Sequence, residues 1–280
     1  MPLLSISSHQ EQVTLSYEIH GNGPNKLMMI SGMNTNGSIW NYMLPHLKDF
    51  TICTFDHRGT GYSSSPKNYS IDVFAEDTIA LADHLKWDAF HICGISMGGF
   101  TCLKIIQKIP NRIVSQTLIS TGMQGRGVPT WTAILLLWIA NIVALFSISL
   151  RSYAIAPLLY PLSYLRQRRQ DGVLNYTYAV GKLNEDFQSR PPPPLKSVVG
   201  HISSALLFKL DKKEIAAIAK LNIPSIVIAG DSDILIRPYF TCKMATELGY
   251  PLYSLQNVGH APISQVPEKT SQLMNKFINK

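Results

Sequence analysis

The stretch FHICGISMGGFTCLKIIQ, residues 90–107, carries the pattern that decides the fold. An apolar run typical of a buried strand leads into GISMG, residues 94–98, and a segment with helical spacing follows. Gly-x-Ser-x-Gly between a strand and a helix is a nucleophile elbow, a sharp turn that exposes the serine, here Ser96. The turn is so tight that the residues two before and two after the serine must be small, and Gly94 and Gly98 meet this requirement.

The chain around this turn alternates between short apolar runs and segments with helical spacing. Strands are expected at residues 12–19, 27–30, 51–56, 90–94, 113–120, 225–230 and 252–257. Helices are expected at residues 38–48, 71–86, 97–109, 239–248 and 263–279. Because strands that alternate with helices form parallel sheets, we predict an α/β fold with a mostly parallel sheet and helices on both faces. Its opening strand, residues 12–19, is expected to be antiparallel.

The composition is that of a folded globular protein. The chain has 280 residues, a net charge of +7, and 46% hydrophobic but only 15% charged residues. Intrinsic disorder requires the opposite balance and is excluded. The basic residues are dispersed apart from Arg166, Arg168 and Arg169, which favours a solvated basic face and predicts no nucleic-acid partner. The N-terminal residues lack the pattern of a signal peptide, so a cytoplasmic protein is expected.

The spacing of cysteines and glycines matches no known motif for a metal, a phosphate or a dinucleotide. The four cysteines, at positions 53, 93, 102 and 242, include no Cys-x-x-Cys pair, so we expect buried reduced thiols and neither a disulfide scaffold nor a zinc site. No other cluster has metal-ligand spacing. The glycines of HRGTGYS and GISMGG match neither a phosphate-binding loop nor a dinucleotide fingerprint. We therefore predict no cofactor and no metal, and we expect Arg58 of HRGTGYS to tie together loops near the site.

The alternation stops between residues 121 and 224, and this interruption contains an unusual apolar segment. Residues 128–150 carry no charge and include enough apolar side chains to span a bilayer. A single span would separate strands that belong to one sheet, so it is excluded. Two interpretations stay open: a lid helix that covers an apolar cleft, or a lid that enters a membrane interface to collect lipid. Trp131 and Trp138 are the predicted substrate-binding residues, and Arg151 also fits interfacial placement.

A serine nucleophile needs a base and an orienting carboxylate, which follow it in the order acid, then histidine. His260, in VGHAP, is the one histidine beyond the resumed strand pattern, and it is the predicted base. GDSD supplies Asp231 and Asp233, and no carboxylate follows the strand at 113–120. We assign Asp233 as the acid that holds the imidazole in the required tautomer, and Asp231 as a turn residue.

A tetrahedral oxyanion needs two backbone N–H donors. The amide of Met97 follows the nucleophile directly and is the first predicted donor. The loop after the strand LMMI, residues 27–30, should supply the second, which we assign to Met33.

The segments FDHRGTGYS, GISMGG, IPSIVIAGDSD and VGHAPISQVPE span nearly the whole chain in order. They resemble the α/β-hydrolase superfamily, in its lid-bearing esterase and lipase-like branch. The resemblance implies an eight-stranded sheet, the triad Ser96, Asp233 and His260, and a core of residues 1–121 and 211–280 interrupted by a helical lid at 122–210. The family usually has His-Gly where this chain has Ser31-Gly32, which affects the contacts that support Met33.

These features predict a serine hydrolase that cleaves a small-molecule ester or thioester with an apolar acyl group, with a lipid as one candidate substrate. Carbon–carbon bond hydrolysis and acyl transfer use the same triad and stay open. Two further interpretations are a low-turnover binding protein or receptor on the same fold and a membrane-docked scaffold that uses the apolar insertion.

Overall fold

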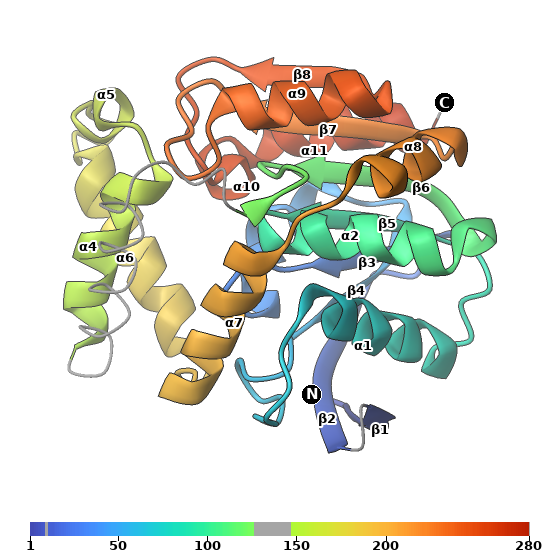
Figure 1. The fold of residues 1–280 in the computed structure, drawn as a ribbon. Coiled ribbons are helices and arrows are strands. Elements are labelled where there is room, and N and C mark those ends of the chain that lie inside the picture. The colour runs from blue at the N-terminus through green and yellow to red at the C-terminus, as the bar shows by residue number, and fades with distance from the viewer. Residues whose placement is uncertain (9–10, 126–146, 280) are drawn as a thin grey trace.

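The computed structural model describes residues 1–8, 11–125 and 147–279, and its centre is one eight-stranded sheet in the order β1-β2-β4-β3-β5-β6-β7-β8 (Figure 1). β2 is antiparallel to β1 and β4, and all other neighbours are parallel, as predicted. The strands are β1 (Leu3–Ser8), β2 (Glu11–His20), β3 (Asn25–Ile30), β4 (Phe50–Phe55), β5 (Phe90–Ile95), β6 (Ile113–Ile119), β7 (Ser225–Gly230) and β8 (Leu252–Leu255).

Helices cover both faces of the sheet. On one face, α1 (Ile71–His84), α2 (Met97–Lys108), α8 (Lys212–Lys220) and α9 (Pro238–Leu248) pack on side chains such as Met28 and Ile30. The opposite face buries Leu27 and Met29 beneath η1 (Gly37–Tyr42), η2 (Leu44–His46) and α11 (Pro267–Ile278). Because successive strand residues point to opposite faces, one continuous apolar run supplies both halves of the core.

Three elements differ from the sequence predictions. β1 was not expected, because its alternation is short and half exposed; pairing along β2, from Leu3 opposite Ser16 onward, defines it. Residues 38–48 form the two 3-10 helices η1 and η2 rather than one α-helix, and Pro45 in η2 has no N–H to donate. The last predicted helix is divided at Pro267 into α10 (Pro262–Gln265) and α11.

The segment between β6 and β7 adds α4 (Ile148–Leu159), α5 (Leu162–Leu165), α6 (Asn175–Gln188) and α7 (Leu195–Leu207) before α8. Figure 1 shows α4, α5 and α6 together to one side of the sheet. These helices share a small apolar core, which also includes Ala261 from the loop between β8 and α10. The predicted membrane contact of residues 128–150 falls mostly on residues 126–146, outside the described residues. Among the helices that the structure describes, none is long and apolar enough to cross a bilayer.

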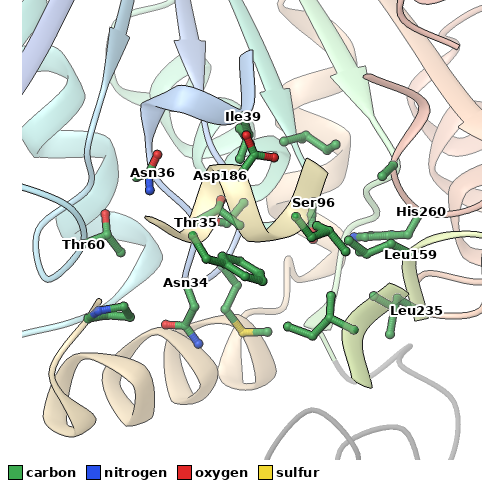
Figure 2. Close-up of a pocket in the computed structure, with 18 of the residues that line it drawn as sticks. Asn34, Thr35, Asn36, Ile39, Thr60, Ser96, Leu159, Asp186, Leu235 and His260 are labelled. Carbon is green, nitrogen blue, oxygen red and sulfur yellow. The ribbon is translucent and has the colours of Figure 1, made fainter. Parts of the chain in front are cut away.

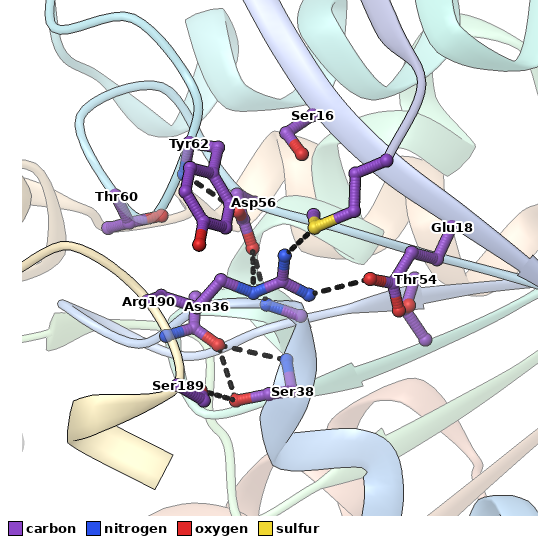
Figure 3. A network of polar contacts seen from close by, with 12 residues as sticks. Ser16, Glu18, Asn36, Ser38, Thr54, Asp56, Thr60, Tyr62, Ser189 and Arg190 are labelled. Carbon is purple, nitrogen blue, oxygen red and sulfur yellow. Dashed lines mark hydrogen bonds and ion pairs between the residues drawn. The ribbon is translucent and has the colours of Figure 1, made fainter.

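A polar network joins the end of α6 to the sheet (Figure 3). Arg190 is buried; it donates to Glu18 at 3.1 Å and lies 3.7 Å from Asp56. Beside it, the Ser189 hydroxyl donates to that of Ser38 at 3.1 Å. These contacts attach the inserted helices to β2, β4 and η1.

The cysteines follow the prediction with one exception. Cys53, Cys93 and Cys102 are buried free thiols, and burial raises the pKa of each above its usual range. Cys242, on α9, is exposed, so the prediction of a buried thiol is wrong there. It lies on the face of α9 that turns away from the sheet.

Candidate active site

Ser96 occupies the turn between β5 and α2 in a strained conformation. Its φ of 55° and ψ of −119° lie in a region that residues with a side chain rarely adopt. Two hydrogen bonds hold the turn: the Ser96 N–H donates to the Ile119 carbonyl at 2.9 Å, and the Thr121 hydroxyl donates to the Ser96 carbonyl at 2.8 Å. The neighbouring strand β6 therefore fixes the position of the predicted nucleophile.

The glycines on either side of Ser96 allow this close approach. A Cβ atom on Gly94 would lie 2.3 Å from the Gly98 carbonyl oxygen, and one on Gly98 would lie 2.1 Å from the carbonyl oxygen of Ile30. Both distances are far below van der Waals contact. The prediction that these positions require small residues is confirmed.

Asp233 and His260 are brought together from the loops after β7 and β8. Nδ1 of His260 and Oδ2 of Asp233 are 2.8 Å apart, and both side chains are buried. The other carboxylate oxygen, Oδ1, accepts the N–H groups of Leu235 and Ile236 at 2.8 and 2.9 Å. Because the carboxylate accepts a hydrogen bond from the N–H at Nδ1, this tautomer leaves Nε2 unprotonated and able to act as a base.

The imidazole and the serine face the same cavity. Ser96 and His260 both line it, and Figure 2 shows the His260 ring directed toward Ser96. The alternative carboxylate, Asp231, is exposed and accepts the N–H of Asn257 at 2.8 Å, as expected of a turn residue. The structure thus places the three predicted residues of the triad at one site.

The predicted oxyanion donors lie on either side of Ser96. Met97 is the first residue of α2, so its N–H has no acceptor within the helix. Met33 lines the cavity, and a Cβ on the preceding Gly32 would lie 3.5 Å from Cβ of Ser96. The loop after β3 is therefore packed directly against the nucleophile turn.

Buried polar groups support the loop that carries Met33. The Ser31 hydroxyl donates to the Asn36 carbonyl at 3.0 Å, and Nε2 of His57 contacts the Ser31 carbonyl at 3.2 Å. His201, on α7, accepts the N–H of Asn34 at Nδ1 (3.3 Å) and contacts the carbonyl of Arg58 through Nε2 (2.8 Å). Burial lowers the pKa of His57 to about 3 and that of His201 to about 4, so both are neutral near pH 7.

The cavity has a volume of about 200 Å³ and a mainly apolar lining. Apolar members of the lining include Ile39, Ile95, Phe100, Ile155, Leu159, Leu183 and Leu235. Asp186, on α6, also lines it and accepts a hydrogen bond of 2.7 Å from the Tyr42 hydroxyl. Burial raises the pKa of this carboxyl to about 6. The predicted substrate-binding residues Trp131 and Trp138 lie outside the described residues.

Within residues 1–8, 11–125 and 147–279, the structure has no group of three His, Cys, Asp or Glu side chains that could hold a metal ion. The polar groups around Ser96 are instead those of acid–base chemistry: an imidazole, a carboxylate and backbone amides.

Comparison with known proteins agrees with this arrangement. Residues 25–263 match the family described as "alpha/beta hydrolase fold". The chain belongs to the α/β-hydrolase-fold family. The match of this α/β hydrolase covers most of its length and includes Ser96, Asp233 and His260.

Individual relatives are more distant. The chain is 24% identical over 274 residues to 3-oxoadipate enol-lactonase 1 of Acinetobacter baylyi, which covers 97% of this chain and 95% of the relative. It is 34% identical to enol-lactonase 2 of the same organism over 127 residues, which span 44% of the chain and only 47% of that relative. A solved esterase from Thermogutta terrifontis has a TM-score of 0.80 at 20% identity and covers 100% of this chain and 98% of its own. At that identity the structural match shows the fold alone.

The polar residues of the cavity and its support that sequence reasoning missed include Asn34, Arg151, Asp186 and His201. Arg151 is also a correction, because the structure buries its side chain to 5% exposure in the cavity wall instead of placing it at an interface. Its position next to an uncharged run suggested a membrane edge, whereas packing against the core turns it inward. No local pattern distinguishes these two placements.

Proposed function

We propose that this α/β hydrolase cleaves carboxylic esters or thioesters of apolar acyl groups through a Ser96–His260–Asp233 triad. The observation that carries the proposal is the pairing of His260 with a fully hydrogen-bonded Asp233, beside a serine held at positive φ on the same cavity. The mainly apolar lining supports an apolar acyl chain. The family resemblance and the enol-lactonase relatives support hydrolysis of an acyl–oxygen bond.

The reaction runs in two halves. Oγ of Ser96 attacks the carbonyl carbon while Nε2 of His260 takes its proton, and Asp233 stabilises the imidazolium. The oxyanion accepts hydrogen bonds from the amides of Met97 and Met33. The intermediate expels the alcohol or thiol, which takes the proton from His260. Water then attacks the acyl-enzyme with His260 as base, releases the acid and restores Ser96.

The domain division is part of the same proposal. Residues 1–121 and 211–280 form the catalytic core, and residues 122–210 act as a lid over the cavity. The contacts of α6 through Tyr42 with Asp186 and through Arg190 support a lid that closes on the core.

A fluorophosphonate probe tests the proposal, because it labels a serine rapidly only when the base and oxyanion hole are assembled. We expect the wild type to label and Ser96→Ala to be silent. Asp233→Asn should label slower by about 10³–10⁴-fold, since the imidazole loses its orienting carboxylate. Asp231→Asn is the matched control in the same turn and should label at close to the wild-type rate.

Two outcomes would contradict the triad. A folded wild type that does not label would favour a binding protein on the hydrolase fold. An equal loss of labelling rate in Asp233→Asn and Asp231→Asn would mean that the labelling depends on the shape of the turn rather than on the Asp233–His260 pair. Thermal unfolding of each variant confirms that the comparison is made between folded proteins.

A further inference from the structure

The cavity beside Ser96 contains a buried cation. Arg151, on α4, is 5% exposed and lines the same cavity as Ser96 and His260. Its guanidinium lies 3.9 Å from the centre of the Phe187 ring, and Nη2 donates a long hydrogen bond of 3.4 Å to the Asn34 carbonyl. At least the Nε donor is therefore without a partner in the described residues.

No acidic side chain neutralises this guanidinium. Within the residues that the structure describes, Arg151 forms no ion pair, and Asp186 of the same cavity is paired with Tyr42 instead. The sequence between the described ranges, residues 9–10 and 126–146, contains no Asp or Glu that could supply one. Burial lowers the pKa of Arg151 to about 10, so it stays charged near pH 7. Burying a charge without a counter-ion costs free energy of folding. A bound anion would offset that cost, so the site favours binding of an anion.

A second unpartnered group stands next to it. Asn34 is 6% exposed, and neither Oδ1 nor Nδ2 of its side chain has a hydrogen-bond partner in the described ranges. Its backbone is held by His201 at the N–H and by Arg151 at the carbonyl. In the view of Figure 2, Asn34 and His260 lie on opposite sides of Ser96. The polar end of the cavity is thus separate from the general base.

We infer that Arg151 and Asn34 form a subsite for a carboxylate of the substrate, so that this hydrolase selects monoanionic esters. The planar guanidinium matches a carboxylate, and the Asn34 amide supplies one more donor. A substrate carboxylate would supply the counter-charge that Arg151 lacks, whereas the second charge of a phosphate dianion would meet no free cation in the described lining, because Arg190 of the same lining is already paired with Glu18. The inference rests on the proposed function for the ester group, which places the scissile carbonyl at Ser96 and the carboxylate at the other end of the apolar chain.

Binding to Ser96→Ala tests the subsite without turnover. Monomethyl adipate carries its carboxylate on the acyl side, and 4-acetoxybutanoate carries it on the alcohol side. Each is compared by calorimetry with its neutral methyl ester, dimethyl adipate or methyl 4-acetoxybutanoate. We expect at least one charged ligand to bind about tenfold or more tighter than its neutral match, as for a charge-assisted hydrogen bond. The preference should disappear in Ser96→Ala/Arg151→Met.

Two further variants separate recognition from a structural role. Asn34 has a φ of 55°, which aspartate tolerates as asparagine does. Asn34→Asp therefore keeps the shape of the side chain, and its carboxylate would repel the anion, so the preference for the charged ligand should be lost. Arg151→Lys keeps a cation but loses the planar guanidinium, so it should retain part of the preference for the charged ligand. Equal binding of charged and neutral ligands to Ser96→Ala, or an unchanged preference after Arg151→Met, would overturn the inference.

Failure of the subsite and failure of the triad give different results. If wild type labels with fluorophosphonate but shows no preference for the charged ligands, the hydrolase proposal stands and the subsite does not. If the preference is present but the folded wild type does not label, the subsite stands on a protein that is not a serine hydrolase.

Discussion

Arg58 in the sheet core and Arg151 in the inserted helices are both buried, but their charges have opposite surroundings. In the core, Arg58 is completely buried and forms a two-pronged ion pair with Asp77 on α1, with both distances at 2.6 Å. In the insertion, Arg151 is buried almost as deeply, but no carboxylate in the described residues meets it. The core pair joins the loop after β4 to α1, and Arg58 also donates to the Asn68 carbonyl at 3.0 Å, which ties two loops together as predicted. The charge of the insertion faces the cavity instead, where a ligand can use it.

The largest effect on stability should come from breaking the core pair. Asp77→Asn keeps the shape of the side chain but leaves the Arg58 guanidinium without its full counter-charge. We expect the free energy of unfolding to fall by about 3 kcal/mol, because removing one partner of a buried ion pair strands the other. Urea unfolding measures it. Asp83→Asn, which breaks the exposed pair with Arg112 on the surface, is the control and should cost at most about 1 kcal/mol.

A smaller, pH-dependent effect is expected at Asp186. Burial raises its pKa to about 6 in the folded protein, above the value near 4 of an unfolded carboxyl. Between about pH 4 and pH 6 the folded state keeps a proton that the unfolded state has lost, so this group lowers stability as pH rises through that window. Asp186→Asn should remove a loss of stability of about 2–3 kcal/mol. Unfolding at pH 4 and pH 7.5 checks it: a wild-type-to-variant difference that is the same at both pH values would contradict the prediction.

The smallest change in stability is expected where the charge is unpaired. Arg151→Met has similar length and removes a buried charge that has no counter-ion, so the free energy of unfolding should change by no more than about 1 kcal/mol or should rise. The same substitution at Arg58 removes the ion-pair partner of the buried Asp77 and should cost several times as much. Chemical unfolding of the two variants side by side compares the regions directly. Similar losses for both would show that Arg151 is a structural element like Arg58.

Much of the core could be predicted from local patterns. Apolar runs of four to six residues mark the central strands because a strand covered on both faces is apolar at every position. GISMG marks the elbow because few residues fit so tight a turn, and the chain order of serine, acid and histidine leaves one candidate base. The exceptions, β1 and the broken helices at residues 38–48 and 263–279, occur where local periodicity is weak or a proline interrupts it.

The polar end of the cavity could not be predicted in this way. Arg151 contacts a residue 117 positions away, Asn34, and His201 contacts one 143 positions away, Arg58. Whether an arginine after an apolar run is exposed or buried depends on what packs over it, and that is decided by residues remote in the chain.

The amino-acid sequence by itself therefore determined the strand order along the chain, the elbow and the identity of the predicted triad, because each follows from spacing and local conformation. Tertiary structure alone decided that Arg151 and Asn34 meet in the wall of one cavity with no counter-charge among the described residues, because burial and pairing are properties of packed surfaces rather than of any one segment.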